Sequence, residues 1–215
     1  MLTETHELIG PGGDFRSVMS GEPDRESKPG ERWAGIWSCY PIRHLTSSVS
    51  DTSRCSAALI MHPDIGEIVV YATVLPWLGS EWGGFASAGG AAFEAALTKY
   101  SLDWQRLRAA FPNALCVVAG DFNQDFAPYH YYGSKYQRRV LEQKLAAAGL
   151  VARTSEANDP INWKPTERHA CIDHICTTES SDIRIGSITR WPLSGKPDNR
   201  VSDHTGVAIE LFPQS

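Results

Sequence analysis

The 215-residue chain lacks several features that would place it in a class at once. No apolar run approaches the ~18 residues needed to cross a bilayer. The first residues, MLTETHELIG, have neither the basic start nor the apolar stretch of a signal peptide. We therefore expect a cytoplasmic protein without a membrane span. A Gly-x-Ser-x-Gly elbow, a phosphate loop ending in Gly-Lys-Ser/Thr and a glycine-rich dinucleotide fingerprint are also missing, which removes the usual sequence signals for those enzyme classes.

The chain has fewer basic than acidic residues. Lys and Arg total 20 against 25 for Asp and Glu, and residues 1–31 hold seven acidic and three basic side chains, so −4 of the net −5 lies there. Nonspecific affinity for nucleic acid comes from Lys and Arg neutralising many phosphates. The composition therefore gives no support to binding of nucleic acid by bulk charge, although a local basic cleft stays open.

Cysteine is sparse and odd in number. The five cysteines sit mostly in apolar runs, which suits reduced, buried thiols better than a disulfide framework. Hydrophobic residues make up 42% and charged residues 21%, the ordinary globular mix, so disorder and fibrous repeats are excluded. With no repeat and no linker, residues 1–215 are expected to form a single domain; the oligomeric state is left open.

The apolar pattern predicts an α/β fold with a sheet at its centre, because two helices fall between strands. Residues 10–30 and 79–90 are rich in Gly, Ser and charged or polar residues and are expected to be loops. Strands are predicted at residues 33–42, 55–62, 67–75, 114–120, 171–177, 183–191 and 205–212, and helices at residues 93–111 and 135–148.

Gly120-Asp121-Phe122-Asn123 is the strongest local signal, because it follows a buried strand. Polar residues at the carboxyl ends of strands are where α/β proteins place their sites. Asp121 could take a proton or hold a cation, and Asn123 could donate to a phosphoryl oxygen. The alternative is a strand-ending turn in which these residues serve only backbone geometry.

Two further patterns carry Asp and His. Asp203 and His204 precede the last predicted strand, where adjacent side chains diverge and can serve different partners, or simply cap a turn. Asp173 lies in an apolar strand, where a carboxylate needs a partner, and an imidazole is the natural one. A zinc site is disfavoured, because strand alternation points its candidate ligands to opposite faces. Those candidates are His169, Cys171, His174 and Cys176.

Taken in order, LTET, WSCYPI, VYATVLPW, VAGDFNQ, CIDHICTT and VSDHTGVAIEL resemble the endonuclease/exonuclease/phosphatase superfamily, which includes pancreatic-type deoxyribonucleases, apurinic-site endonucleases, inositol-polyphosphate phosphatases and sphingomyelinases. The resemblance covers nearly the whole chain. It implies a four-layer α/β sandwich, with two packed mixed β-sheets and helices outside. It also implies a metal-dependent hydrolase of phosphate esters, most often a phosphodiesterase or nuclease, that works by in-line attack of water.

The resemblance also implies roles for individual residues. Glu4 and Asp203 correspond to metal-side carboxylates for Mg²⁺, with Mn²⁺ a possible substitute. Asp121 corresponds to the residue that orients or deprotonates the water, and Asn123 to its phosphate-contacting neighbour. His204 corresponds to the imidazole that binds the scissile phosphate, and Asp173 to the carboxylate that orients that imidazole. The expected partner is a phosphate-ester substrate.

Two departures from the family pattern qualify this expectation. Relatives usually begin with a strand bearing an Asn, yet Met1 is three residues before Glu4, so that first strand is expected to be missing. Many relatives carry His or Tyr at the position of Val74 to assist the leaving group, and only His44, His62 or a metal-bound water could substitute. The alternatives are therefore a catalytically weak member that binds a phosphorylated ligand or a protein, and a longer active form. Trp77 and Trp82 could line a substrate groove.

Overall fold

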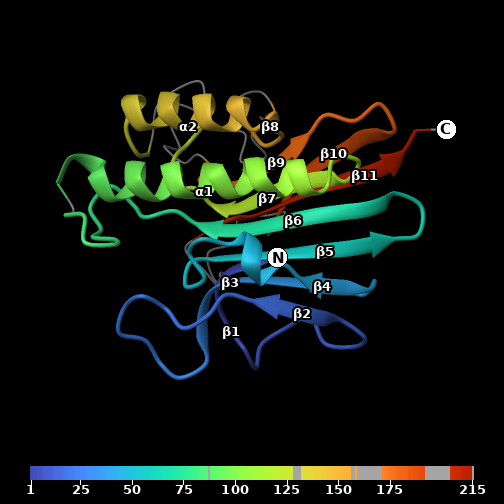
Figure 1. The fold of residues 1–215 in the computed structure, drawn as a ribbon, viewed down its shortest axis with the longest axis horizontal. Coiled ribbons are helices and arrows are strands. Elements are labelled where there is room, and N and C mark those ends of the chain that lie inside the picture. The colour runs from blue at the N-terminus through green and yellow to red at the C-terminus, as the bar shows by residue number, and fades with distance from the viewer. Residues whose placement is uncertain (87, 128–131, 156–157, 159–170, 192–203, 215) are drawn as a thin grey trace.

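A six-stranded mixed sheet forms the centre of the molecule in the computed structural model, which describes residues 1–86, 88–127, 132–155, 158, 171–191 and 204–214 (Figure 1). The strand order is β4-β5-β6-β7-β9-β8. Only the β6–β7 pair is parallel, since α1 connects these two strands. The strands are β4 (Ile42–His44), β5 (Cys55–His62), β6 (Gly66–Val74), β7 (Leu115–Asp121), β8 (Leu150–Ala152) and β9 (Asp173–Thr178).

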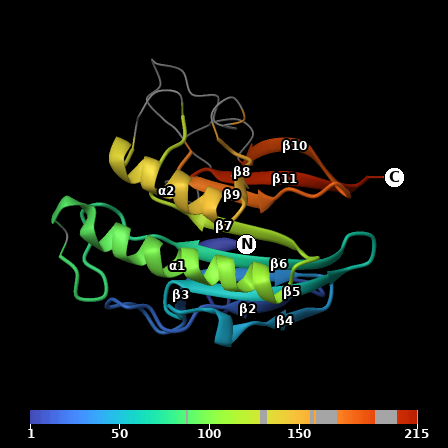
Figure 2. The ribbon, with the colours of Figure 1, turned by 45° about the horizontal axis from the view of Figure 1, so that its top comes forward.

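Two helices, α1 (Ala91–Ala110) and α2 (Lys135–Ala147), cover one face of this sheet (Figures 1 and 2). Side chains of α1 spaced three and four residues apart are buried against the sheet, among them Phe93, Tyr100 and Trp104. Ser134 caps α2, because its hydroxyl accepts a hydrogen bond from the backbone of Gln137 at 3.1 Å. Both predicted helices are therefore confirmed to within two residues at each end.

A second layer of strands packs on the opposite face. The strands β1 (Leu2–His6), β3 (Glu31–Ser38) and β2 (Arg16–Met19) form an antiparallel sheet in the order β1-β3-β2, and β10 (Ile183–Trp191) pairs with β11 (Gly206–Pro213) as a separate ribbon. A core between the layers contains Ala34 and Ile36 from β3 with Ala58 and Ala72 from the central sheet. The predicted α/β sandwich with two packed sheets is thus confirmed, except that the described strands of the second layer are antiparallel rather than mixed.

The largest local differences from prediction are in the N-terminal part. Residues 33–42 were predicted as one strand but belong to β3 and β4, because the chain turns around Tyr40 and Pro41 before β4 pairs with β5. Strand β2 lies inside the predicted loop of residues 10–30, and β1 and β8 were not predicted. Polar composition hides β1 and β2, whose pairing with β3 is a tertiary contact. The described residues also contain two short 3₁₀ turns, Thr46–Ser48 and Ala88–Gly90.

Gly120 allows β7 to approach β6 closely at the end where the candidate residues lie. Its φ is +142°, and a Cβ at this position would overlap the carbonyl oxygen of Thr73. Only glycine fits such a close approach of two backbones. The glycine of the Gly-Asp-Phe-Asn motif is therefore a packing requirement that fixes where the next residue, Asp121, leaves the strand.

All five cysteines carry free thiols, four of them buried and Cys39 exposed. This agrees with the expectation of reduced rather than paired cysteines. Within the described ranges, the structure contains no helix that is both long and apolar enough to cross a membrane.

Candidate functional site

Three side chains from distant parts of the sequence meet at one end of the central sheet. Asp121 ends β7, Asp173 begins β9, and His204 precedes β11. Each offers one possible ligand atom, and these atoms all lie within 4.8 Å of one another. Asp121 and Asp173 are also directly paired across the two strands. Like charges in this position repel each other, so the cluster needs positive charge nearby.

His204 supplies one such partner. Its Nδ1 donates a hydrogen bond of 2.7 Å to Oδ2 of Asp173, which is an acceptor when ionised. This contact joins the approach to β11 with the central sheet. With Nδ1 donating to Asp173, the imidazole ring has a set orientation.

Asn123 fixes the carboxylate of Asp121. The backbone N–H of Asn123 donates to Oδ1 at 2.8 Å, and its side-chain Nδ2 donates to Oδ2 at 2.9 Å and to the carbonyl of Leu75 at 2.8 Å. Asn123 adopts a φ of +49°, a conformation that Asn tolerates better than most residues. Both amide hydrogens already have acceptors, so in this arrangement Asn123 holds Asp121 rather than offering a donor to a phosphoryl oxygen.

Burial makes ionisation of Asp121 costly. Its pKa is raised from 3.8 to about 7, first by desolvation and then by the charge of Asp173, while the backbone hydrogen bond from Asn123 and the charge of His204 lower it. Glu4 raises it further. A buried carboxylate between two other carboxylates favours either a proton or a cation.

Glu4 therefore lies close enough to influence Asp121, although it is not one of the three clustered residues. It is in β1, with an exposed side chain and a φ of +48° that is uncommon for a residue other than glycine. Strained backbone of this kind is concentrated at functional sites. The structure thus brings together Asp121, Asn123, Asp173 and His204 with Glu4 at the border, whereas Asp203 lies outside the described residues.

The donor set fits a small divalent cation. Oxygen ligands from one to three carboxylates, completed by water, are what Mg²⁺ prefers. Asp121 and Asp173 bring two carboxylates together, and burial followed by the charge of Asp173 raises the pKa of Asp121. Glu4 is the third carboxylate acting on the same place.

Among the described residues, the structure does not bring Cys171, His174 and Cys176 together as zinc ligands. His174 is buried, its Nε2 donates to the carbonyl of Gln124 at 2.9 Å, and its Nδ1 lies 3.0 Å from the hydroxyl of Thr154. These contacts place His174 beneath the site as a support for the segment after Asp121. Sequence reasoning missed Gln124 and Thr154, because neither residue has a distinctive spacing. His169 lies outside the described residues.

Val74 is a buried apolar neighbour of Asp121, with which it pairs across β6 and β7. His62 does not compensate for it. His62 pairs with Gly66 at the opposite end of β6, so the eight-residue step to Val74 spans roughly 26 Å. His44 is also away from this end, since it pairs with Ala58 on the far side of β5.

The two tryptophans considered for a substrate groove differ in their surroundings. Trp82 donates its indole N–H to Oδ2 of Asp51 at 2.8 Å and packs against Tyr100 of α1, so it anchors its loop. Trp77 is exposed, with 53% of its surface accessible.

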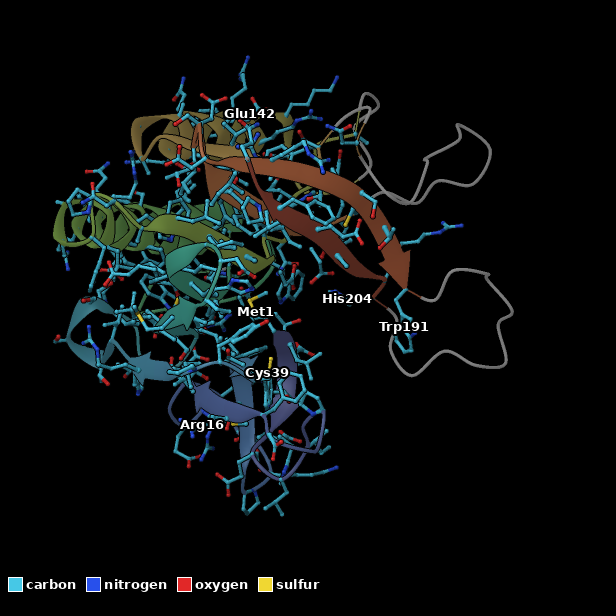
Figure 3. All side chains as sticks on the ribbon, turned by 90° about the vertical axis from the view of Figure 1, so that its right-hand side faces the viewer. Met1, Arg16, Cys39, Glu142, Trp191 and His204 are labelled. Carbon is cyan, nitrogen blue, oxygen red and sulfur yellow. The ribbon has the colours of Figure 1, made fainter. Side chains whose placement is uncertain are left out.

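A cavity of about 460 Å³ opens beside the cluster. Its lining includes Met1, Leu2 from β1, Val117 and Ala119 from β7, and Ile209 from β11. Met1 and His204, which both line it, are labelled in Figure 3, with the N-terminal strands below them and the C-terminal ribbon above. The site is therefore reached between the two layers of strands.

No protein-family model matches the sequence, and no curated protein matches it. Solved structures do. An endonuclease/exonuclease/phosphatase structure from Beutenbergia cavernae shares 17% identity and a TM-score of 0.58 over 92% of this chain, which spans only 53% of that longer chain. An AP endonuclease from Archaeoglobus fulgidus shares 18% identity and a TM-score of 0.62. The match covers 96% of this chain and 85% of the endonuclease chain.

The endonuclease domain of TRAS1, a telomere-specific non-LTR retrotransposon, gives a TM-score of 0.62 at 16% identity, covering 92% of this chain and 78% of that one. At such identities the likeness concerns the fold. The resemblance noticed in the sequence motifs is matched by these independent structural similarities. This chain has the α/β sandwich fold of the endonuclease/exonuclease/phosphatase structures.

Proposed function

We propose that this protein is a metal-dependent hydrolase of phosphate esters, of the phosphodiesterase or nuclease type. The observation that carries the proposal is the convergence of Asp121, Asp173 and His204 within 4.8 Å, at the strand ends of a fold that includes known nucleases. Phosphoryl transfer needs an oriented water, donors to the phosphoryl oxygens and a cation against the developing charge. The cluster offers side chains of each kind.

Each residue has a proposed role. Asp121, held by Asn123, orients the attacking water and accepts its proton. His204 binds a phosphoryl oxygen through Nε2, and Asp173 keeps its ring in place through Nδ1. Glu4 and Asp203 are the proposed metal-side carboxylates for Mg²⁺, or for Mn²⁺ in its place. A bound divalent cation would neutralise charge on the phosphoryl and leaving oxygens.

A second candidate is a catalytically weak protein that binds a phosphorylated ligand. Val74 favours it, because a buried valine beside Asp121 cannot donate a proton to the leaving group. Losing such assistance costs a hundredfold or more, about the usual contribution of a general acid.

The test is hydrolysis of bis(p-nitrophenyl) phosphate with Mg²⁺ or Mn²⁺. We expect Asp121→Asn and His204→Ala each to lower kcat at least about a hundredfold. Glu142→Gln, on the exposed side of α2, is the matched control and should retain full activity. Activity that survives in both site variants would refute these roles. Tight binding of a nucleotide without turnover, measured by calorimetry, would favour the second candidate.

A further inference from the structure

A second cavity of about 480 Å³ lies along β1. It is lined by Glu4, Thr5, Arg25, Lys28, Arg32 and Trp33, among others. Both cavities share Leu2 and Thr3, and Glu4 in this one acts electrostatically on Asp121. We call it the β1 groove. It adjoins the candidate site along a single strand.

The position of Arg25 is built into the fold. Its guanidinium carbon lies 4.0 Å from the centroid of the Trp33 ring, a cation–π contact. The preceding residue, Asp24, accepts hydrogen bonds from the indole of Trp33 at 2.7 Å and from Nε of Arg54 at 2.6 Å. The segment carrying Arg25 is therefore tied to the buried tryptophan, and the guanidinium is held beside Glu4 at 3.8 Å.

Lys28 is also held in place. Its backbone N–H donates to Glu31 at 3.1 Å, and Glu31 donates back to its carbonyl at 3.1 Å, which closes a turn. The next two residues contact β1, since His6 hydrogen-bonds Pro29 and Glu7 hydrogen-bonds Gly30. The lysine thus projects from a turn that is pinned to the strand bearing Glu4.

The donors of the β1 groove differ in whether they already have partners. Arg32 is neutralised by Glu7 at 2.7 Å and Glu22 at 3.0 Å. The ammonium of Lys28, by contrast, has no ion pair within the described part of the chain.

From these contacts we infer that the β1 groove binds a second phosphate group of the substrate, next to the one that is hydrolysed. The planar guanidinium of Arg25 and the ammonium of Lys28, two residues that line one groove, are donors of the kind that bind phosphate. This inference rests on the proposed function and narrows it, because it selects substrates with two neighbouring phosphates. The partner could be the next nucleotide of a strand or a small bisphosphate, which share this chemistry.

Two chromogenic diesters test the inference: thymidine 3′-(p-nitrophenyl phosphate) with and without a 5′-phosphate. We expect the 5′-phosphate to raise kcat/KM of the unaltered protein about tenfold, the value of one charged contact. Lys28→Ala and Arg25→Ala should reduce that ratio toward one, and Lys28→Arg should restore most of it. Lys99 is on α1, and its ammonium lies over the ring of Trp82. Lys99→Ala is the control and should leave the ratio unchanged.

Binding to the full chain in EDTA separates failure of the inference from failure of the proposed function. There, competition by the two diesters against fluorescein-labelled dT10 reports the groove without turnover. Preference for dT10 over the 5′-phosphorylated diester identifies a nucleic-acid strand as the source of the second phosphate. In that case the slope of log K against log salt concentration for dT10 binding should be smaller by about 0.7 in Lys28→Ala. Preference for the diester identifies a small bisphosphate. Equal binding of both diesters, unaffected by Lys28→Ala and Arg25→Ala, would overturn the inference even if hydrolysis is observed.

Discussion

The carboxylate of Asp121 lies in surroundings that disfavour its ionised form. Its carboxylate is buried, faces Asp173 across the strand pair and is influenced by Glu4. The hydrogen bonds from Asn123 offset only part of this cost, since the pKa remains raised to about 7. A residue held in an unfavourable charge state by its surroundings is typical of sites that act on protons or cations.

The raised pKa of Asp121 predicts that the stability of the metal-free protein, measured in EDTA, depends on pH. A carboxyl group whose pKa is 3.8 unfolded and about 7 folded stabilises the fold fully at low pH, and the contribution is lost as the pH rises through about 7. The full shift is on the order of 4 kcal/mol. Asp121→Asn should therefore shrink the fall in Tm between pH 5 and pH 8, as measured by calorimetry. The exposed Asp64→Asn serves as control, and an equal fall in both variants would contradict the assignment.

The sequence revealed this residue because of its position. Asp121 and Asn123 follow a short, uniformly apolar strand, and such a strand ends where polar groups can gather. No local pattern marks Glu4 as a functional residue, because a single Glu near the terminus resembles any surface residue. Only the family resemblance identified it. Thr5, Arg25 and Lys28 gave no signal, since their arrangement depends on a loop folding back over Trp33.

At the level of elements, Asp103 connects three parts of the fold. Its fully buried carboxylate accepts hydrogen bonds from the backbone and hydroxyl of Ser50 at 2.8 and 2.7 Å and from the hydroxyl of Tyr71 at 3.0 Å. It thereby joins α1, the loop before β5 and strand β6. The helix itself was predictable from its apolar spacing, but this carboxylate was not, because its partners are 53 and 32 residues away.

Asp103→Ala should lower the free energy of unfolding by about 2–4 kcal/mol, because it leaves the hydroxyl of Tyr71 and the amide of Ser50 buried without a partner. Urea denaturation measures the change. The control is Arg106→Ala, which removes an exposed ion-pair partner of the same carboxylate and should cost less than about 1 kcal/mol. Similar losses in both variants would show that the buried hydrogen bonds contribute little.

Across the whole molecule, the sheets differ in how well they are supported. Strands β5, β6 and β7 have hydrogen-bonded neighbours on both sides and lie between two cores. Strand β11 pairs only with β10 among the described strands, and its inward residues Val207, Ile209 and Leu211 are half-buried. All three line the first cavity, and Leu211 also packs against the core between the two layers.

We therefore expect hydrogen exchange to distinguish the two regions. Amides of β10 and β11 should exchange through local opening, well before those of β6 and β7, which require global unfolding. Exchange followed by mass spectrometry on peptides covering residues 183–191 and 66–74 measures the difference. Identical protection in the two peptides would show that the ribbon and the central sheet unfold as one unit.

The hydrogen bond between Asp173 and His204 bridges these two regions, which we expect to differ in stability. The imidazole belongs to the less firmly held side, and the carboxylate to the more firmly held one. Detachment of the ribbon would separate the pair while most of the backbone stays folded. The temperature range over which this protein works would then be set by how long its weakest strands stay docked, and not by the melting of its central sheet.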